Sequence, residues 1–242
     1  MISKNSFSLS LMVVAFLALS SCGGSDFRKS PVDEIVRDLP NDEIFSVILY
    51  DMDQKGNFSS TYYHKYQIIR ELDGDASEVL TDWREVSERE FTKNIDNMGM
   101  EIVARDSTGA LTKEAAPPGY NNYVGNPKYG QWENRGGTSF WAFYGQYAFM
   151  SSMFRMTMFP VHRSYYNDWR GNYRGTGRGY YGPGGTGSRY YGTGSGYSRT
   201  NNPNSSWTSS RNNSFKNRVA SRTSRSSGRS SSRRSRGGGS GK

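Results

Sequence analysis

The 242-residue chain has one cysteine, Cys22, and two histidines, His64 and His162. A single cysteine cannot form a disulfide within the chain, so packing alone must stabilise any folded part. Neither histidine lies at the spacing from a serine, a cysteine or acidic residues that a catalytic triad or a metal site requires. The sequence therefore predicts structural histidines and a protein that is not an enzyme and has no metal site or cofactor.

Other short patterns approach known ligand sites without completing them. The segment DMDQKG (51–56) resembles the start of a calcium-binding loop, but Lys55 replaces the third oxygen ligand and Tyr62 replaces the closing glutamate. Glycine-rich segments at 175–182 and 192–197 lack the strand and helix that flank a dinucleotide-binding loop, and GGGSGK (237–242) lacks the first glycine of a P-loop. We therefore expect a hairpin turn at 51–56 and flexible glycine-rich segments.

Long apolar runs are also scarce. The clearest spans residues 9–19, is interrupted only by Ser10, and follows a short segment in which Lys4 is the only charge. A run of this length is too short to span a bilayer stably. A charged start, a short apolar core and small residues after it are the parts of a secretory signal. Residues 1–21 are therefore predicted to be a signal peptide rather than a fold element.

The end of this signal contains the lone cysteine. Leu19-Ser20-Ser21-Cys22 resembles the lipobox of bacterial lipoproteins. The resemblance covers residues 1–22 only, and it implies that Cys22 is acylated and becomes the first residue after cleavage. Two or three acyl chains, at about 0.8 kcal/mol per buried CH₂, would hold the mature chain in a membrane. An ordinary signal or a buried thiol is the alternative.

The residues after the cysteine bear on localisation. Gly23 and Gly24 follow Cys22, whereas lipoproteins of this class that stay at the inner membrane have an aspartate in the next position. The resemblance therefore implies the cell envelope, with the outer membrane or the cell surface favoured.

Charge divides the mature chain into an acidic part and a basic part. Residues 22–160 carry 14 Lys/Arg and 21 Asp/Glu, whereas residues 161–242 carry 16 Lys/Arg and only Asp168. The mean hydropathy of −0.79 and the 28 glycines indicate that much of the chain cannot form a packed core. We therefore expect an N-terminal linker at 22–41, a folded region, and a basic tail.

Residues 42–116 have the pattern of a small α+β domain with an antiparallel sheet and one helix. EIFSVILYDMD and TYYHKYQIIRE have the length and the β-branched and aromatic content of strands. The turn residues of DQKGNFSS between them predict an antiparallel pair. EVLTDWREV, which contains Trp83, predicts a third strand, and MEIVARD predicts a closing strand.

One helix is expected between the last two strands. Ser87 and Glu90 have the spacing of a capping box, in which each residue satisfies a backbone N–H of the other. We expect the helix to run to about Asn97, because Gly99 suits the left-handed position that ends a helix.

Residues 117–169 form a segment rich in aromatic residues and glycine. Its apolar stretch, 138–159, contains one charge, Arg155, and has apolar residues on every face of a helical wheel. This pattern predicts a helix packed against the α+β domain. The alternatives are a helix in the membrane interface and a membrane span.

Residues 170–242 are of low complexity. A Tyr-Tyr-Gly unit occurs at 180–182 and again at 190–192, and from residue 201 serine, asparagine and arginine dominate. Few apolar residues and a high net charge leave little to offset chain entropy, so the sequence predicts a disordered tail over all of 170–242.

The arginines of this tail are the candidate binding residues. Guanidinium groups spaced by serine and glycine form a flexible cation whose donors suit phosphate oxygens. Together with the tyrosines before them, they loosely resemble the Arg/Gly-rich segments of single-stranded nucleic-acid binders. The candidates are Arg211, Arg218, Arg222, Arg225, Arg229, Arg233, Arg234 and Arg236.

The sequence therefore predicts a non-enzymatic, lipid-anchored envelope protein whose tail contacts a polyanion: lipopolysaccharide, anionic lipid, a cell-wall polymer or nucleic acid. A solubilising tail without a dedicated ligand is the simpler alternative. Another is a glycan-binding or envelope-assembly module that uses Tyr129, Trp132, Trp141 and Tyr144 as a platform for sugar rings. An unrecognised enzyme ranks third, and no protein partner is identified.

Overall fold

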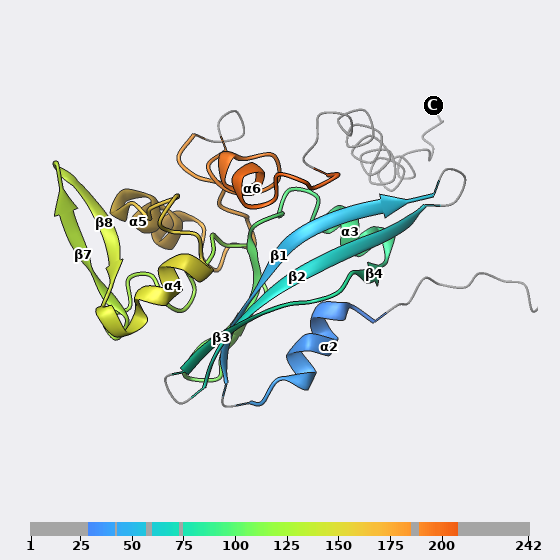
Figure 1. Ribbon diagram of the computed structural model, residues 1–242, viewed down its shortest axis with the longest axis horizontal. Helices are drawn as coiled ribbons and strands as arrows, with labels where there is room; N and C mark the ends of the chain where they lie inside the picture. The colour runs from blue at the N-terminus through green and yellow to red at the C-terminus, as the bar shows by residue number, and fades with distance from the viewer. Residues whose placement is uncertain (1–28, 42, 57–59, 73–74, 185–188, 208–242) are drawn as a thin grey trace, which may run out of the picture.

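A computed structural model describes residues 29–41, 43–56, 60–72, 75–184 and 189–207. Its centre is an antiparallel sheet in the order β3-β2-β1-β5-β6, with β4 also paired to β2 (Figure 1). The strands are β1 (Ile44–Lys55), β2 (Thr61–Leu72), β3 (Asp75–Leu80), β4 (Arg84–Val86), β5 (Glu101–Arg105) and β6 (Leu111–Thr112). The predicted α+β class is confirmed, with an antiparallel sheet and several helices.

The β1–β2 hairpin forms as predicted, in a register from Ile44 opposite Glu71 to Lys55 opposite Thr61. The strand β1 is longer than expected, because it continues through Lys55 with a bulge between Leu49 and Asp51. The prediction of a hairpin turn at 51–56 is therefore wrong for 51–55, which are extended.

The expected third strand is divided into β3 and β4. Both pair with β2, β3 opposite 67–72 and β4 opposite 62–64. The break occurs because Thr81 bonds to Tyr66 through both its backbone and its side chain: the Thr81 hydroxyl accepts from the Tyr66 N–H at 3.0 Å. A side-chain acceptor in place of a carbonyl interrupts the ladder, and Trp83 lies exposed in the gap.

The predicted helix is α3 (Glu88–Lys93), and Ser87 caps it by accepting from the Glu90 N–H at 3.1 Å. The helix ends at Lys93, earlier than expected, and turns lead to Gly99, which has a φ of +80°. A second helix, α2 (Pro31–Asp38), lies in the region expected to be a linker. Proline at the first helical position and acidic residues in the first turn favour this helix.

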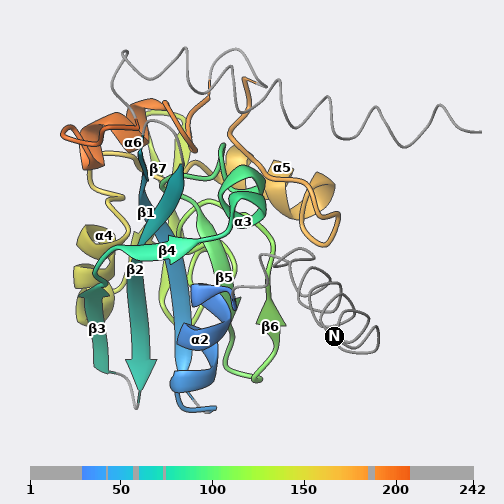
Figure 2. The same cartoon turned by 90° about the vertical axis from the view of Figure 1, so that its right-hand side faces the viewer.

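Two cores cover the two faces of the sheet. On one face, Phe45, Val47 and Leu49 of β1 pack with residues of α2 and α3, and we call this cluster the α2–α3 core. On the other face, Ile44 and Ile48 pack against tyrosines from later in the chain, and we call this cluster the aromatic core. Alternate residues of a strand point to opposite faces, so β1 is buried on both. Figure 2 shows α2 and α3 in front of the sheet.

The segment 117–169 contains a hairpin that sequence reasoning missed. The strands β7 (Gly130–Arg135) and β8 (Thr138–Phe143) pair with Trp132 opposite Trp141. They are joined by Gly136 and Gly137, which both have positive φ. Glycine pairs suit the tight turns of hairpins, so this signal was present in the sequence.

The predicted single helix over 138–159 is therefore wrong, because its first third is β8. It continues as a 3₁₀ turn, η2 (Gly145–Tyr147), and a short helix, α4 (Ala148–Met153), and the longer helix α5 (Arg163–Asn172) follows. Among the described residues, no helix is both long enough and apolar enough to cross a bilayer.

The prediction of disorder from residue 170 onward is wrong for 170–184 and 189–207. Tyr180, Tyr191, Tyr197 and Trp207 are only 1%, 2%, 4% and 1% exposed. The helix α6 (Gly196–Asn201) is capped by Ser195, whose hydroxyl accepts from the Ser198 N–H. Tyrosine rings bury large apolar areas. The repeated Tyr-Tyr-Gly units therefore contribute side chains to the core, although the segment contains few aliphatic residues.

Candidate functional site

The residues that the sequence analysis proposed as sites, Cys22 and the eight tail arginines, lie outside the described residues. The structure does describe the two positions from which these segments extend, near Ser30 and at Trp207. It also describes a groove beside β8 and a buried carboxylate in β5. These three features are the candidates for function.

Residues near both ends of the described chain contact α3. The Ser30 hydroxyl lies 3.4 Å from Oε1 of Glu90, and the Trp207 ring packs edge-on against Phe91 with ring centroids 5.0 Å apart. Glu90 and Phe91 are consecutive residues of α3. We call Ser30, Glu90, Phe91 and Trp207 the chain-end site. Ser30 and Trp207 therefore both lie beside α3.

A strap of residues 202–207 holds the C-terminal side of this site against β1. The Asn202 side-chain amide donates to the Tyr50 carbonyl, the Ser205 hydroxyl donates to Asp51 at 2.5 Å, and the Ser206 hydroxyl donates to Asp53 at 2.8 Å. Asp51 and Asp53 thus fix the strap from an extended strand. Among the described residues, no group of three or more His, Cys, Asp or Glu side chains is placed to hold a metal ion.

Some arginines of the expected tail belong to the fold. Arg189 forms an ion pair with Asp96 at 2.6 Å and lies over the Tyr181 ring. Arg174 lies over Trp169, and Arg178 lies over Tyr173. These cations therefore stabilise packed aromatic residues.

An open groove of about 540 Å³ runs beside β8, and we call it the β8 groove. Residues 140–143 line it, together with Met156, Thr157 and Pro160. Glu133 and Arg135 also line it and form an ion pair at 2.8 Å. The groove therefore combines aromatic surface with a carboxylate and a guanidinium group.

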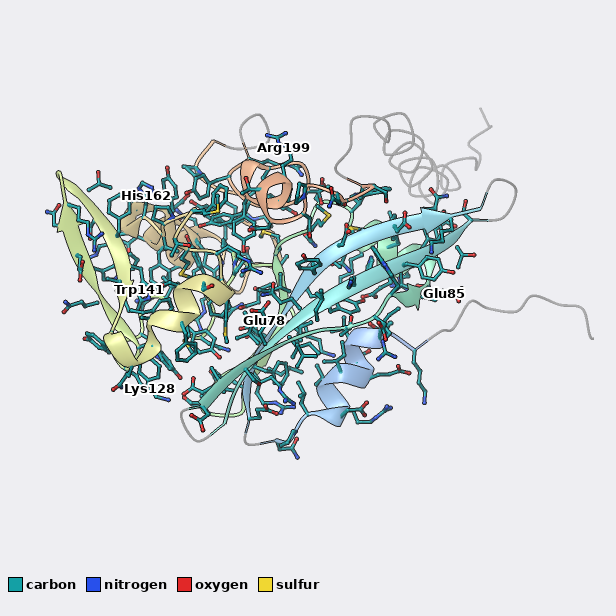
Figure 3. The ribbon with its side chains drawn as sticks, in the orientation of Figure 1. Glu78, Glu85, Lys128, Trp141, His162 and Arg199 are labelled. Carbon is teal, nitrogen blue, oxygen red and sulfur yellow. The ribbon has the colours of Figure 1, made fainter. Side chains whose placement is uncertain are left out.

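The four aromatic residues expected to form a sugar platform do not share one exposed face. Tyr129 and Trp141 are buried, Trp132 is half-buried against Trp141 with ring centroids 5.2 Å apart, and only Tyr144 is exposed, at 40%. Trp141 lines the β8 groove, whereas Tyr129 packs inside the aromatic core. Figure 3 shows Trp141 at the β7–β8 end of the molecule and Glu85 near α3.

Glu101 is the buried carboxylate, and it links the sheet to the aromatic core. It is 0% exposed, and it accepts from the Gly119 N–H at 3.1 Å and from the Asn121 side-chain amide at 2.5 Å. Burial raises the pKa of Glu101 to about 7, although these hydrogen bonds oppose the shift. Its position depends on contacts between distant residues, so no local pattern in the sequence could have identified it.

The histidines lie among aromatic rings. His64 is buried, stacks on Phe91 with ring centroids 5.5 Å apart, and has Nδ1 3.1 Å from the Tyr66 hydroxyl. Burial lowers the pKa of His64 to about 3, so its ring is neutral near pH 7. His162 stacks on Tyr165 at 4.5 Å.

Glu101→Gln should remove a pH dependence of stability. The pKa of Glu101 is higher in the folded state, about 7, than its ordinary value of 4.5, so its stabilisation is complete below pH 4.5 and is lost as the pH rises to about 7. Glutamine resembles the protonated form. Urea unfolding should therefore show the variant to be more stable above pH 7, by up to about 3 kcal/mol, with the difference vanishing near pH 4.

The difference in free energy of unfolding between the unmodified chain and the variant reports on Glu101 alone. His64 has the opposite effect, because it destabilises the fold as the pH falls from 6.5, but this effect is the same in both proteins. Parallel stability curves from pH 4 to 8 would show that Glu101 does not take up a proton on folding.

No protein-family model, curated protein or solved structure matches this chain.

Proposed function

We propose that this chain is a lipid-anchored protein of the bacterial cell envelope, with a non-enzymatic structural or binding role and a cationic tail that contacts polyanions. The lipobox-like sequence that ends at Cys22 supports the anchor. The observation that carries the binding role is the position of Trp207. This residue is buried in the α2–α3 core, and all eight candidate arginines follow it in the sequence.

We assign the binding role to residues 208–242, because arginines that precede them are engaged in the fold. Arg174, Arg178 and Arg189 contact rings or a carboxylate of the fold. Residues 208–242 contain ten Lys/Arg and no Asp or Glu. Serine and glycine between these cations fix no geometry for reading a nucleic-acid sequence, so the segment should recognise phosphate charge rather than a particular base sequence.

Salt should weaken this binding steeply. The mature chain should bind DNA or lipopolysaccharide with log K falling as log salt rises, by roughly 0.7 to 0.9 per phosphate contacted, because each neutralised phosphate releases counterions. Replacement of four tail arginines by glutamine should lower the affinity and flatten the slope together. These residues are Arg229, Arg233, Arg234 and Arg236.

A matched control removes the same charge from exposed positions of the folded part. The control variant replaces Lys55, Arg84, Arg89 and Arg170 by glutamine. It should retain the affinity and the slope of the unmodified chain. Equal losses in the two variants would show that net charge, rather than the tail, governs binding, and a slope near zero in the unmodified chain would exclude phosphate contacts as the mechanism.

The β8 groove favours a second candidate function, the binding of an envelope saccharide. Aromatic rings can pack on the apolar faces of sugars, and the paired Glu133 and Arg135 offer both an acceptor and donors for hydroxyl groups. This candidate replaces the platform expected from the sequence, because only Trp141 of those four residues lines the groove.

Substitutions in the groove test this candidate directly. Phe140→Ala and Glu133→Gln should each weaken the binding of cell-wall glycan fragments by roughly tenfold, the loss expected for one contact of about 1.4 kcal/mol. Tyr144→Ala is the matched control, because this exposed ring does not line the groove and its loss should leave binding unchanged. Isothermal calorimetry measures the affinities, and glycan binding that survives both groove substitutions would exclude the groove.

A further inference from the structure

We propose that a pocket between α2 and α3 binds a small zwitterion, an amino acid or a dipeptide, through the carboxylate of Glu90 and the ammonium group of Lys93. The pocket lies beside the chain-end site, with which it shares Ser30 and Glu90. Its role goes beyond the proposed function, because it depends on neither the lipid anchor, nor the tail, nor the β8 groove. The inference follows from the charges that line the pocket, from two buried asparagines and from the size of the pocket.

Four parts of the fold line this pocket, which has a volume of about 270 Å³. They are the start of α2, the end of α3 with the turn after it, β5 and the residues after β6, and Figure 2 shows these elements beside one another. The volume is slightly below the roughly 300–1,000 Å³ of pockets that hold drug-sized molecules, so the ligand should be smaller than these. The charged and amide residues of the lining are Asp33, Glu90, Lys93, Asn94, Asn97 and Lys113.

Two of the four charges in the lining are unpaired. Lys113 forms an ion pair with Asp33 at 2.7 Å. Glu90 and Lys93, by contrast, have no ion-pair partner among the residues that the structure describes. They lie three residues apart in α3 and are therefore neighbours on the helix surface. A carboxylate and an ammonium group side by side, each without a counter-ion, match the two charges of a zwitterion, whereas a ligand of one charge would be repelled by one of them.

Two buried asparagines provide further hydrogen-bonding groups. Asn94 and Asn97 line the pocket and are only 5% and 8% exposed. The Tyr181 hydroxyl donates to Oδ1 of Asn97 at 2.8 Å, and the Asn97 amide donates to Oδ1 of Asn94 at 3.1 Å, so both side chains are fixed in position. The second N–H of the Asn97 amide has no acceptor among the described residues. Burial of an unpaired donor is unfavourable, and a ligand oxygen in the pocket would satisfy it.

The lining assigns the two ends of the ligand. The ligand carboxylate binds the Lys93 ammonium group and the free N–H of Asn97, and the ligand ammonium group binds the Glu90 carboxylate. The pocket also has an apolar part, which suits a short aliphatic side chain. This part consists of Val32, Ile102 and Ala115.

Isothermal titration calorimetry of the full mature chain with L-valine and with L-alanyl-L-alanine tests the proposal. At least one of these zwitterions should bind with a Kd below about 1 mM, and the tighter of the two identifies the free amino acid or the peptide as the source of the ligand. The N-acetylated form of the tighter ligand lacks the ammonium group, and its C-terminal amide lacks the carboxylate. Each should bind at least about tenfold more weakly, because it leaves one charged group of the pocket unpaired.

Two substitutions assign the ligand charges to residues. Lys93→Gln and Glu90→Gln should each weaken binding of the zwitterion at least about tenfold. Lys93→Gln should not weaken binding of the amide further, and Glu90→Gln should not weaken binding of the N-acetylated form further, because the interaction is already absent. The matched controls are Arg89→Gln and Glu88→Gln, which remove exposed charges of α3 that do not line the pocket. Both controls should leave the affinity unchanged.

Several results would overturn the proposal. One is the absence of saturable binding of both zwitterions up to about 10 mM. Another is an affinity for the N-acetylated or amidated form that equals the affinity for the zwitterion. A third is an equal loss in the variants and in their matched controls. Lys93 is exposed, so its replacement should not disturb the fold, and urea unfolding of each variant verifies that a loss of binding is not a loss of structure.

Discussion

A chain that ends at Trp207 should unfold in urea at the same midpoint as the full mature chain, whereas a chain that ends at Trp169 should not fold. The shorter chain lacks four fully packed aromatic residues, Tyr180, Tyr191, Tyr197 and Trp207. Loss of a single large buried ring costs about 3–5 kcal/mol, and a typical domain has a net stability of about 5–15 kcal/mol. The two cores cannot survive the loss of all four rings.

Two substitutions in the chain that ends at Trp207 refine this test. Trp207→Ala should lower the free energy of unfolding by about 3–5 kcal/mol, because the ring is buried in the α2–α3 core and packs edge-on against Phe91. Trp83→Ala is the matched control and should change it little, because Trp83 is exposed in the gap between β3 and β4. A stable, cooperative fold in the chain that ends at Trp169 would contradict the packing of residues 170–207.

Cys22→Ser should move the protein from the membrane fraction to an unprocessed or soluble form. Acyl transfer to this position in the lipoprotein class uses the thiol, and a serine hydroxyl cannot replace it. The whole of the acyl anchor is then lost, rather than a part of it. Detergent phase separation after a high-salt wash measures the change, because salt removes contacts of the tail.

The tail variant with four arginines replaced by glutamine is the control for this experiment. It should stay in the detergent phase after the high-salt wash, because its acyl chains are intact. A Cys22→Ser protein that remains firmly bound after the wash would show that another segment is the anchor.

The sequence was sufficient for elements that depend on local signals. The β1–β2 hairpin, the closing strand β5 and the Ser87 cap were all predicted from residues within each element. Two further local signals were present but did not enter the prediction. Gly136 and Gly137 mark the turn of the β7–β8 hairpin, and Pro31 marks the start of α2. The signal at Cys22 is equally local, and acylation there stays a prediction.

The aromatic core could not be predicted from composition. Residues 170–207 are rich in glycine, serine and arginine, which is typical of disorder. The folded state uses their tyrosines instead: the Tyr197 hydroxyl donates to the Phe154 carbonyl, and the Tyr181 hydroxyl donates to Asn97. Arg189 is paired with Asp96, so part of the positive charge is compensated by the fold. These contacts join residues far apart in the sequence, and no local pattern reveals them.

Mass spectrometry of the mature N-terminus tests the central claim most directly. Membranes of cells that express the chain should yield an N-terminal peptide that begins at Cys22 and carries acyl chains on its sulfur and, where the amino group is also modified, on its nitrogen. An N-terminal peptide that begins at Met1, or at a residue after Cys22, or at an unmodified Cys22, would contradict the lipid anchor and the envelope function built on it.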